Sequence, residues 1–179
     1  MARYFETFPK LLYDIDNTKN FKLVTDIFRR IKVREQLKTN AALFSKYSVP
    51  SGEQPETTSY KHFGTTDYFW IILLLNDITD RYYGWPLSDQ DFEKYVNDKY
   101  ANPAGIHHYE ITQSSGNTTG SSPDDYSHKI EVNETEAGAE SVSNYEYERR
   151  EQDKLRSIKL LDPAFLGLFI EEFERLVSQ

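Results

Sequence analysis

Residues Tyr60 to Ile78 read YKHFGTTDYFWIILLLNDI, and this stretch decides the fold of the chain. A glycine interrupts it, and glycine can adopt the left-handed backbone that ends one helix and permits a tight hinge before the next. The apolar run that follows is hydrophobic on most of its faces, so this second helix is predicted to lie at the centre of the core. An asparagine at its end can cap the last turn through its side chain. The residues expected to build this core are Gly64, Trp70, Ile71, Leu74 and Asn76.

Strands and helices are predicted on both sides of this stretch from periodicity and capping residues. Before it, residues 43–49 alternate like a strand, and Pro55 is placed to start the first helix. After it, residues 77–86 form an aromatic loop, and Ser88 with Asp91 caps a third helix. The other expected elements are strands at 106–112, 128–132 and 158–161, a charged helix opened by Ser143 and Glu146, and a terminal helix opened by Asp162 and Pro163. The pattern predicts an α+β fold.

Less regular segments flank this core. Residues 4–14 mix aromatic side chains with a proline and predict an extended arm or hairpin, and residues 23–33 have apolar residues at helical spacing, which predicts a short basic helix. Residues 112–127 are rich in Ser, Thr, Gly and Asn and predict a mobile hairpin tip. We therefore expect four parts, which are an arm with a short helix over 1–40, the core over 41–100, a hairpin insertion over 101–142, and a helix, strand and helix over 143–179.

Composition bounds the class of function. The chain has 179 residues and a net charge of −8, which does not favour a nucleic-acid binder. It has no cysteine, so disulfides and thiolate chemistry are excluded. Its longest apolar run is far shorter than the roughly 20 residues that span a bilayer, and its first residues lack the apolar stretch of a signal peptide. We expect neither a membrane span nor export by that route.

Aromatic content and charge layout depart from the average. Aromatic residues make up 15% of the chain, a content that suits protein interfaces. Residues 1–47 carry ten basic and five acidic side chains, a net charge of +5, whereas residues 48–179 carry a net charge of −13. The basic arm of one copy could contact the acidic body of a neighbour, or both could be solvated faces of a monomer.

Two patterns could carry chemistry, and both are weak. Residues 11–18 contain D-x-D-x-T, with which haloacid-dehalogenase-type phosphatases place a nucleophilic carboxylate and a magnesium ligand, but the further acidic pair occurs only at Asp124 and Asp125 in the polar tip. His107 and His108 could gather around a metal with His128, yet adjacent strand residues point to opposite faces unless a bulge intervenes. We expect no catalytic residue, no metal site and no cofactor.

The order of these motifs resembles a known family. Residues 60–78 are similar to the two-helix core of a LysM domain, in which a helix ending in an aromatic residue and glycine precedes an apolar helix ending in asparagine. The loop NDITDRYYGWPLS at 76–88 and three later segments follow in the order of the LysM-like baseplate wedge subunit of contractile-tailed, T-even-like bacteriophages. The resemblance covers nearly the whole chain apart from residues 112–142. The turn at 51–55 departs from it, because it lacks the Asp-Thr-Leu of carbohydrate-binding modules.

This resemblance implies a non-enzymatic structural protein of the virion, located in the tail baseplate and assembled in the host cytoplasm. It would join neighbouring wedges in the inner ring of a six-fold assembly, with other baseplate wedge proteins as partners and without nucleic acid, membrane or small-molecule substrate. The alternative is a LysM-type module that binds peptidoglycan through its N-acetylglucosamine polymers. The residues expected to contact partners are Tyr4, Phe5, Phe8, Arg29, Arg30, Tyr82, Tyr83, Trp85, Phe169 and Phe173.

Overall fold

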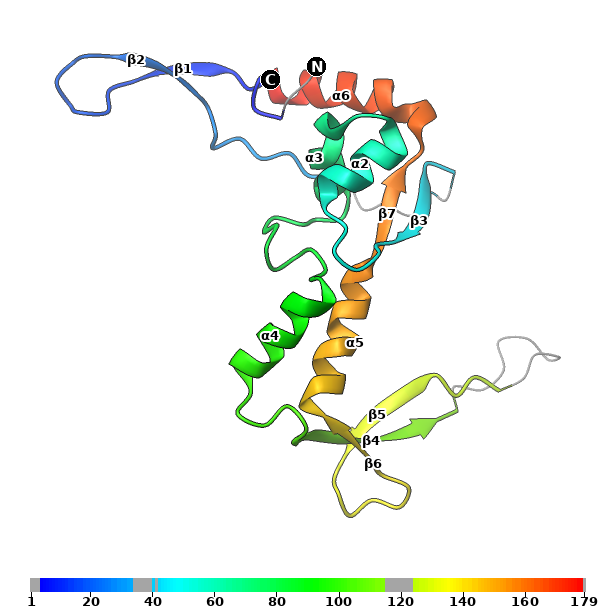
Figure 1. Cartoon of the computed structure of the whole chain (residues 1–179). Coiled ribbons are helices and arrows are strands. Elements are labelled where there is room, and N and C mark those ends of the chain that lie inside the picture. Colours follow the sequence, from blue (N-terminus) through cyan, green and yellow to red (C-terminus); the bar gives the residue numbers. More distant parts are fainter. Residues whose placement is uncertain (1–3, 34–39, 41, 115–123, 179) are drawn as a thin grey trace. The chain divides into compact units, whose positions relative to one another are not determined.

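The computed structural model describes residues 4–33, 40, 42–114 and 124–178 (Figure 1). The chain combines helices with several small antiparallel sheets, which confirms the α+β class. It divides into two compact units, residues 1–86 with 155–179 (unit 1) and residues 87–154 (unit 2). Among the helices of the described residues, none combines the length and the hydrophobicity that a bilayer crossing needs.

The centre of unit 1 is a pair of strands that encloses two helices in sequence. β3 (Phe44–Ser48) pairs antiparallel with β7 (Ser157–Leu161). Between them in the chain lie α2 (Pro55–Phe63), the short 3-10 turn η1 (Thr66–Tyr68) and α3 (Phe69–Leu75). Figure 1 shows both helices next to this strand pair, and α3 contacts both α2 and β7. The strand and the two helices expected on either side of Gly64 are confirmed.

The hinge between the helices follows from local chemistry. Gly64 has φ of 76°, a left-handed backbone that a glycine adopts without strain, and its N–H donates to the Tyr60 carbonyl at 2.9 Å. The Ser59 hydroxyl donates to the Thr65 carbonyl at 2.7 Å, and the Thr65 side chain accepts from the Asp67 N–H. The chain therefore reverses within a few residues and leads directly into α3.

Asn76 joins α3 to the distant strand β7. Its side-chain Nδ2 donates to the carbonyls of Ile72 at 2.8 Å and Lys159 at 2.9 Å, and its Oδ1 accepts from the Lys159 N–H at 2.8 Å. The expected helix cap is present, and the same amide also bonds to residue 159 on both sides of its backbone. This pairing fixes the end of the apolar helix against the sheet.

Replacing Asn76 by alanine is expected to lower the free energy of unfolding of unit 1 by about 2–3 kcal/mol, because three hydrogen bonds of roughly 1 kcal/mol each are lost. Chemical denaturation measures this change. Alanine at Asn97 in unit 2 is the matched control, because its side-chain Nδ2 donates to the Glu93 carbonyl within an exposed helix turn. This variant should change the free energy of unfolding little. Equal stability of the Asn76 and Asn97 variants would contradict the role given to Asn76.

The core of unit 1 brings residues from three distant segments together. Trp70 of α3 lies against Phe173 of α6 (Leu166–Ser178), with ring centroids 4.6 Å apart, and against Tyr4 at 5.5 Å. Phe8 is buried in the same cluster, and its ring lies 6.3 Å from that of Phe173. The first residues of the chain are therefore part of the core and not only of an arm.

The arm, which we define as residues 4–33, continues from this core as a hairpin. β1 (Lys10–Tyr13) pairs antiparallel with β2 (Lys22–Thr25), and Figure 1 shows both strands extending beyond the helices of unit 1. The short helix predicted at 23–33 is wrong. Residues 22–25 pair with β1, the Asp26 N–H donates to the Pro9 carbonyl at 2.8 Å, and residues 26–33 contain no helix. An isolated helix of that length is marginal, so strand pairing prevails.

The described residues of unit 2 form two helices and a three-stranded sheet. The sheet has the order β5-β4-β6, built from β4 (Ile106–Gln113), β5 (His128–Val132) and β6 (Glu140–Ser143), and the helices are α4 (Asp89–Lys99) and α5 (Asn144–Arg156). The two expected strands are confirmed, and β6 is an additional strand. Most of the predicted hairpin tip, residues 115–123, lies outside the described residues.

Capping residues start the helices of unit 2 where the sequence predicts. The Ser88 side chain accepts from the Asp91 N–H, and the Ser143 hydroxyl accepts from the Glu146 N–H at 3.1 Å. In unit 1, Asp162 likewise accepts from the Ala164 N–H at 2.9 Å, ahead of a 3-10 turn and α6. Each cap satisfies a backbone N–H that the helix itself leaves without a partner.

Candidate interaction surface

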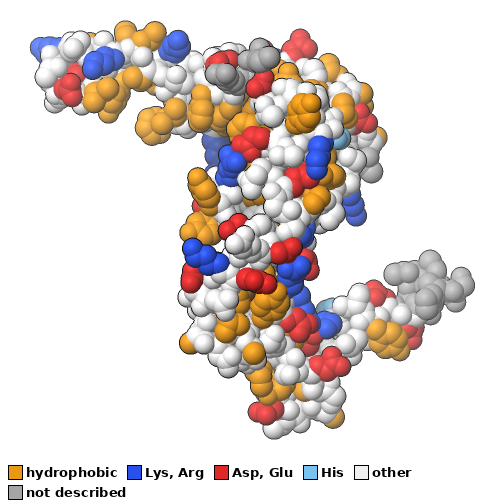
Figure 2. Space-filling model, viewed as in Figure 1, with side chains coloured by type: hydrophobic (Ala, Val, Ile, Leu, Met, Phe, Trp, Pro, Cys, Tyr) orange, Lys and Arg blue, Asp and Glu red, His pale blue; other side chains and the backbone are white. Residues whose placement is uncertain are grey.

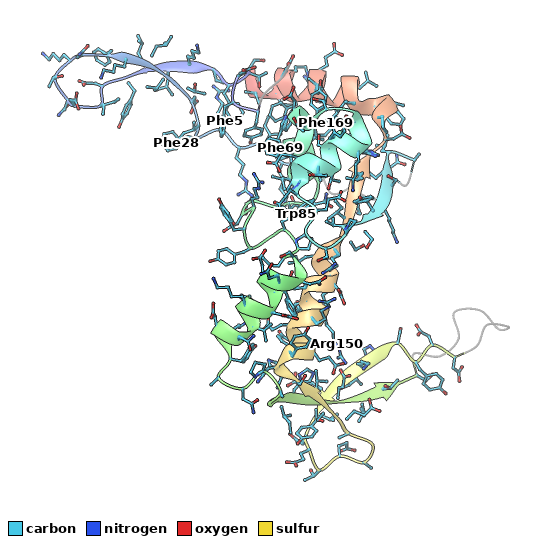
Figure 3. The ribbon with its side chains drawn as sticks, in the orientation of Figure 1. Phe5, Phe28, Phe69, Trp85, Arg150 and Phe169 are labelled. Atoms are coloured by element: carbon cyan, nitrogen blue, oxygen red, sulfur yellow. The ribbon has the colours of Figure 1, made fainter. Side chains whose placement is uncertain are left out.

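Unit 1 contains an open groove with a volume of about 1330 Å³. The arm forms one wall, and η1, α3 and residues 77–79 form the other. Figure 2 shows hydrophobic side chains gathered where the arm meets the rest of unit 1. In Figure 3, Phe28 and Phe5 lie on the arm side of this region and Phe69 lies on the helix side. The apolar side chains that line the groove include Phe5, Ile27, Phe28, Phe69, Leu73 and Ile78.

The arm side of the groove is unusually exposed for apolar residues. Phe28 is 91% exposed, Ile27 63% and Phe5 55%. Contiguous apolar surface of this kind is rare on monomeric proteins and marks a site that another molecule covers. The groove is therefore a candidate interaction surface.

Charged residues form the two rims of the groove. On the arm side, Arg29, Arg30 and Lys32 follow Phe28 in the chain. On the opposite side lie Asp67 and Asp77 together with Glu56, which pairs with Arg81 at 2.6 Å. The arm rim, which also includes Glu6 and Lys10, is net basic, and the other rim is acidic.

The hairpin β1–β2 exposes apolar residues beyond the groove. Leu12 lies opposite Leu23 in the strand pair, and both side chains are exposed. A two-stranded hairpin is marginally stable alone in water, and its stability rises when one face packs against another surface. The hairpin thus offers a second apolar patch on the arm.

The aromatic loop (residues 77–86) presents two tyrosines to solvent. The Asp80 side chain accepts from the backbone N–H groups of Tyr82 at 2.8 Å and Tyr83 at 3.3 Å, and these tyrosines are 82% and 79% exposed. A Cβ on Gly84 would lie 2.8 Å from the Asp80 carbonyl oxygen, so this tight turn requires glycine. The turn therefore holds both phenol rings outward.

Three of the residues expected to contact partners are instead buried in the chain's own core. Trp85 is 3% exposed, and its indole N–H donates to the Glu53 carbonyl at 2.7 Å. Phe8 and Phe173 are buried in the cluster around Trp70. We correct these three assignments, because burial within unit 1 leaves no surface for a partner.

The other expected contact residues lie on the surface or at its edge. Arg29 donates to Asp26 at 3.1 Å and to the Val177 carbonyl at 2.9 Å, so it connects the arm to the end of α6. Arg30 is exposed, whereas Tyr4 and Phe169 are half-buried against the core. Phe5, Tyr82 and Tyr83 remain available to a partner, as does Arg30.

The phosphatase-like motif has a structural explanation. The two Asp14 carboxylate oxygens accept from the backbone N–H groups of Thr18 at 3.2 Å and Lys19 at 2.7 Å. These bonds shape the turn that joins β1 to β2, where Asn17 and Lys19 adopt positive φ angles. The motif therefore forms a hairpin turn on the arm and is not placed at the end of a parallel strand.

The paired histidines meet through a bulge. The pairing of β4 with β6 shifts register between Ile106 and His108, and the Nδ1 atoms of His107 and His108 lie 2.8 Å apart. His107 also stacks on Tyr147, with ring centroids 3.9 Å apart. In the part of the chain that the structure describes, no group of three His, Cys, Asp or Glu side chains is arranged to hold a metal ion.

Buried carboxylates hold turns and sheets in place. Glu53 accepts hydrogen bonds from Tyr47 at 2.9 Å, Thr58 at 2.7 Å and Lys61. Burial alone would raise the pKa of Glu53, but the hydrogen bonds from Lys61, Thr58 and Tyr47 outweigh it and lower this pKa below its usual value. Glu53 therefore stays ionised and fixes the turn between β3 and α2.

The sequence did not single out Ile27 and Phe28 as contact residues. Their apolar side chains follow helical spacing with Val24 and Ile31, so the pattern predicts that they lie on one face of a helix. The structure places them in a turn after β2, along the groove. The signal that could have revealed this is Asp26, whose side chain accepts from the Phe28 N–H at 3.2 Å and favours a turn.

Comparison with known proteins agrees with the resemblance seen in the sequence. The family described as Base plate wedge protein 53 matches residues 4–118, which include the arm, the groove and the aromatic loop. The baseplate wedge protein gp53 of Enterobacteria phage T4 is 24% identical over 166 residues, covering 87% of this chain and 85% of the relative. Neither finding supports the alternative of a peptidoglycan-binding module. The chain belongs to the base plate wedge protein 53 family.

Proposed function

We propose that this protein joins neighbouring wedges in the inner ring of a six-fold phage baseplate. Family membership supports a structural role in the tail baseplate of the virion, in contact with other baseplate proteins and without enzymatic activity. The observation that carries the bridging role is that the matched region contains two separate exposed surfaces, the apolar side chains of the arm with its hairpin and the tyrosine pair of the aromatic loop.

Two modest contacts are enough for such a bridge. Burying a large apolar side chain against a partner contributes roughly 1.5–3 kcal/mol to the free energy of binding, before the entropy cost of ordering the side chain is subtracted. Phe28, Leu12 and Leu23 are exposed and available for such burial on the arm, and Tyr82 and Tyr83 on the loop. Linking two contacts in one molecule raises the overall affinity on the order of 10²–10⁴-fold over either alone. Loss of either surface should therefore prevent ring closure.

We also propose that the centre of unit 1 is a LysM-like core that serves as a scaffold. The order β3, α2, α3 and β7, with the two strands antiparallel, supports this proposal. In this arrangement the return strand β7 follows the whole of unit 2 in the chain. The core would then hold the arm and the aromatic loop at fixed positions. Trp70 packs in the same cluster as Tyr4 of the arm, and Trp85 at the end of the aromatic loop is buried in the second cluster.

Removing the β1–β2 hairpin is expected to abolish closure of wedges while leaving the protein folded. Deleting the first 20 residues is unsuitable, because it also removes the buried Phe8. A better variant replaces residues 11–24 by Asn-Gly, which can join the paired residues Lys10 and Thr25 in a two-residue turn. Sedimentation of reconstituted wedges measures closure, and circular dichroism checks folding.

The matched control removes residues 115–123, a polar stretch of the predicted tip. This control is expected to close baseplates as the whole chain does. Complete baseplates at normal yield with the hairpin variant would mean that the hairpin is not one of the two contacts. Failure of the whole chain itself to promote closure would overturn the bridging function.

A further inference from the structure

We propose that the groove of unit 1 binds an amphipathic helix of another baseplate protein, with acidic residues along one flank of its apolar stripe and basic residues along the other. This inference rests on the proposed function and names the kind of partner segment that the arm would hold. It follows from the size of the groove, the distribution of its apolar side chains and the opposite charge of its two rims.

The dimensions and lining of the groove favour a polypeptide segment. Its volume of about 1330 Å³ exceeds the roughly 300–1,000 Å³ of most small-molecule pockets. Apolar side chains lie on both walls, with Ile27 and Phe28 on the arm and Phe69 and Leu73 on the opposite side. An occupant must therefore present apolar atoms in several directions at once, as a helix does with a stripe about 100° wide.

The rims define the charges that the occupant carries. Arg30 and Lys32, with Arg29 that also bonds to Asp26 and Val177, make the arm rim net basic despite Glu6. Carboxylates on the adjacent flank of a bound helix would therefore gain favourable interactions. Asp67 and Asp77 form the opposite rim, so lysine or arginine is favoured on the other flank. Because the two rims have opposite sign, a helix bound in the reverse direction would place like charges together. The groove therefore selects orientation as well as composition.

The three longest described helices of this chain do not provide such an occupant from a second copy. α4 buries Phe92 and Val96, and α6 buries Phe173 and Val177, each within its own unit. α5 has no buried apolar residue and is covered with charged side chains. A helix from a different baseplate protein is therefore the occupant that the surface fits.

A photo-cross-linking amino acid in place of Phe28 tests the identity of the occupant. Phe28 is 91% exposed, so this substitution leaves the core intact. The full-length variant is mixed with purified wedges that lack this protein, irradiated, and analysed by mass spectrometry. We expect cross-links to a wedge-protein segment whose apolar residues recur at three- and four-residue spacing between an acidic and a basic flank. The same amino acid in place of Phe21, an exposed arm residue that does not line the groove, is the control and should not label that segment.

Charge reversal provides a second, independent readout. Arg30→Glu is expected to weaken binding to wedges about tenfold or more, which corresponds to 1.4 kcal/mol, and reversing an acidic residue on the cross-linked flank should restore it. Lys22→Glu, on the arm but outside the groove, should have a smaller effect. Cross-links to residues 10–25 of a second copy, to a segment without the helical pattern, or to no protein would overturn the inference.

The same mixtures separate this inference from the proposed function. If Phe28→Asp and Arg30→Glu close baseplates as well as the whole chain does while the hairpin variant does not, the groove is not a contact, and the arm bridges through its β1–β2 hairpin instead. If the unaltered chain fails to close wedges, the bridging function itself fails, whatever the cross-links show.

Discussion

Replacing Trp70 by alanine is expected to lower the free energy of unfolding of unit 1 by about 3–5 kcal/mol, as for other large core aromatics. Trp70 is buried, and its ring contacts Tyr4 of the arm and both Phe169 and Phe173 of α6. Its loss removes the side chain that connects three distant segments. Because single domains are stable by only about 5–15 kcal/mol, this loss is a large fraction of the stability of unit 1 and should lower its melting temperature markedly.

Thermal and urea denaturation followed by fluorescence measure this effect, since Trp85 remains as the reporter. Trp70→Phe is the matched control, because it keeps an aromatic ring in the cluster and should cost less than the alanine variant. An alanine variant with an unchanged melting curve would contradict the central position given to Trp70.

Replacing Arg150 by alanine is expected to destabilise unit 2 by about 3 kcal/mol, because it leaves a buried carboxylate without its main partner. Glu110 is buried and accepts from two nitrogens of Arg150, at 2.7 Å and 3.0 Å, and from Lys129. Figure 3 labels Arg150 in unit 2. The Arg150 guanidinium is the main cause that lowers the pKa of Glu110, and burial opposes this effect; the pKa falls from 4.5 to about 2.

The sign of the pH dependence follows from this shift. A carboxylate whose pKa is lower in the folded state contributes its stability above the unfolded pKa, and this contribution is lost as pH falls toward the folded value. Unit 2 should therefore lose stability between about pH 4.5 and pH 2 through Glu110. Urea denaturation followed by circular dichroism across this range measures the loss. Glu110→Gln should flatten the dependence, while Glu131→Gln, at the exposed position directly opposite in β5, should not. If the free energy of unfolding depended on pH equally in both variants, Glu110 would not be the cause of the loss of stability.

Much of the fold could be predicted from local sequence signals. Gly64 and the capping residues Thr65, Ser88 and Ser143 act within a few residues, so their positions define helix ends without tertiary information. Strands were expected at 106–112 and 128–132, and the structure pairs β4 with β5 there. The wedge-protein family was also indicated, because the resemblance of the aromatic loop extends over a string of residues long enough to be specific.

The remaining features depend on contacts between distant residues. The segment 23–33 has a helical pattern, but pairing of β2 with β1 and the turn at Asp26 override it. Phe8 and Trp85 were assigned to partner contacts because they lie in aromatic arms and loops, yet each finds its place in a core built by other segments. The strand β6 has only four residues and forms by pairing with β4, a contact that composition does not reveal.

The central claim is that one molecule contacts two neighbouring wedges, and a double cross-link tests it most directly. Photo-cross-linking amino acids are placed at Phe28 and Tyr82 of the same chain, both exposed, and baseplates are assembled from a mixture of isotopically heavy and light wedges. The account predicts doubly linked molecules in which one position carries a heavy wedge protein and the other a light one. Doubly linked molecules whose two positions always carry the same label would show that both surfaces contact a single wedge, which would contradict the bridge.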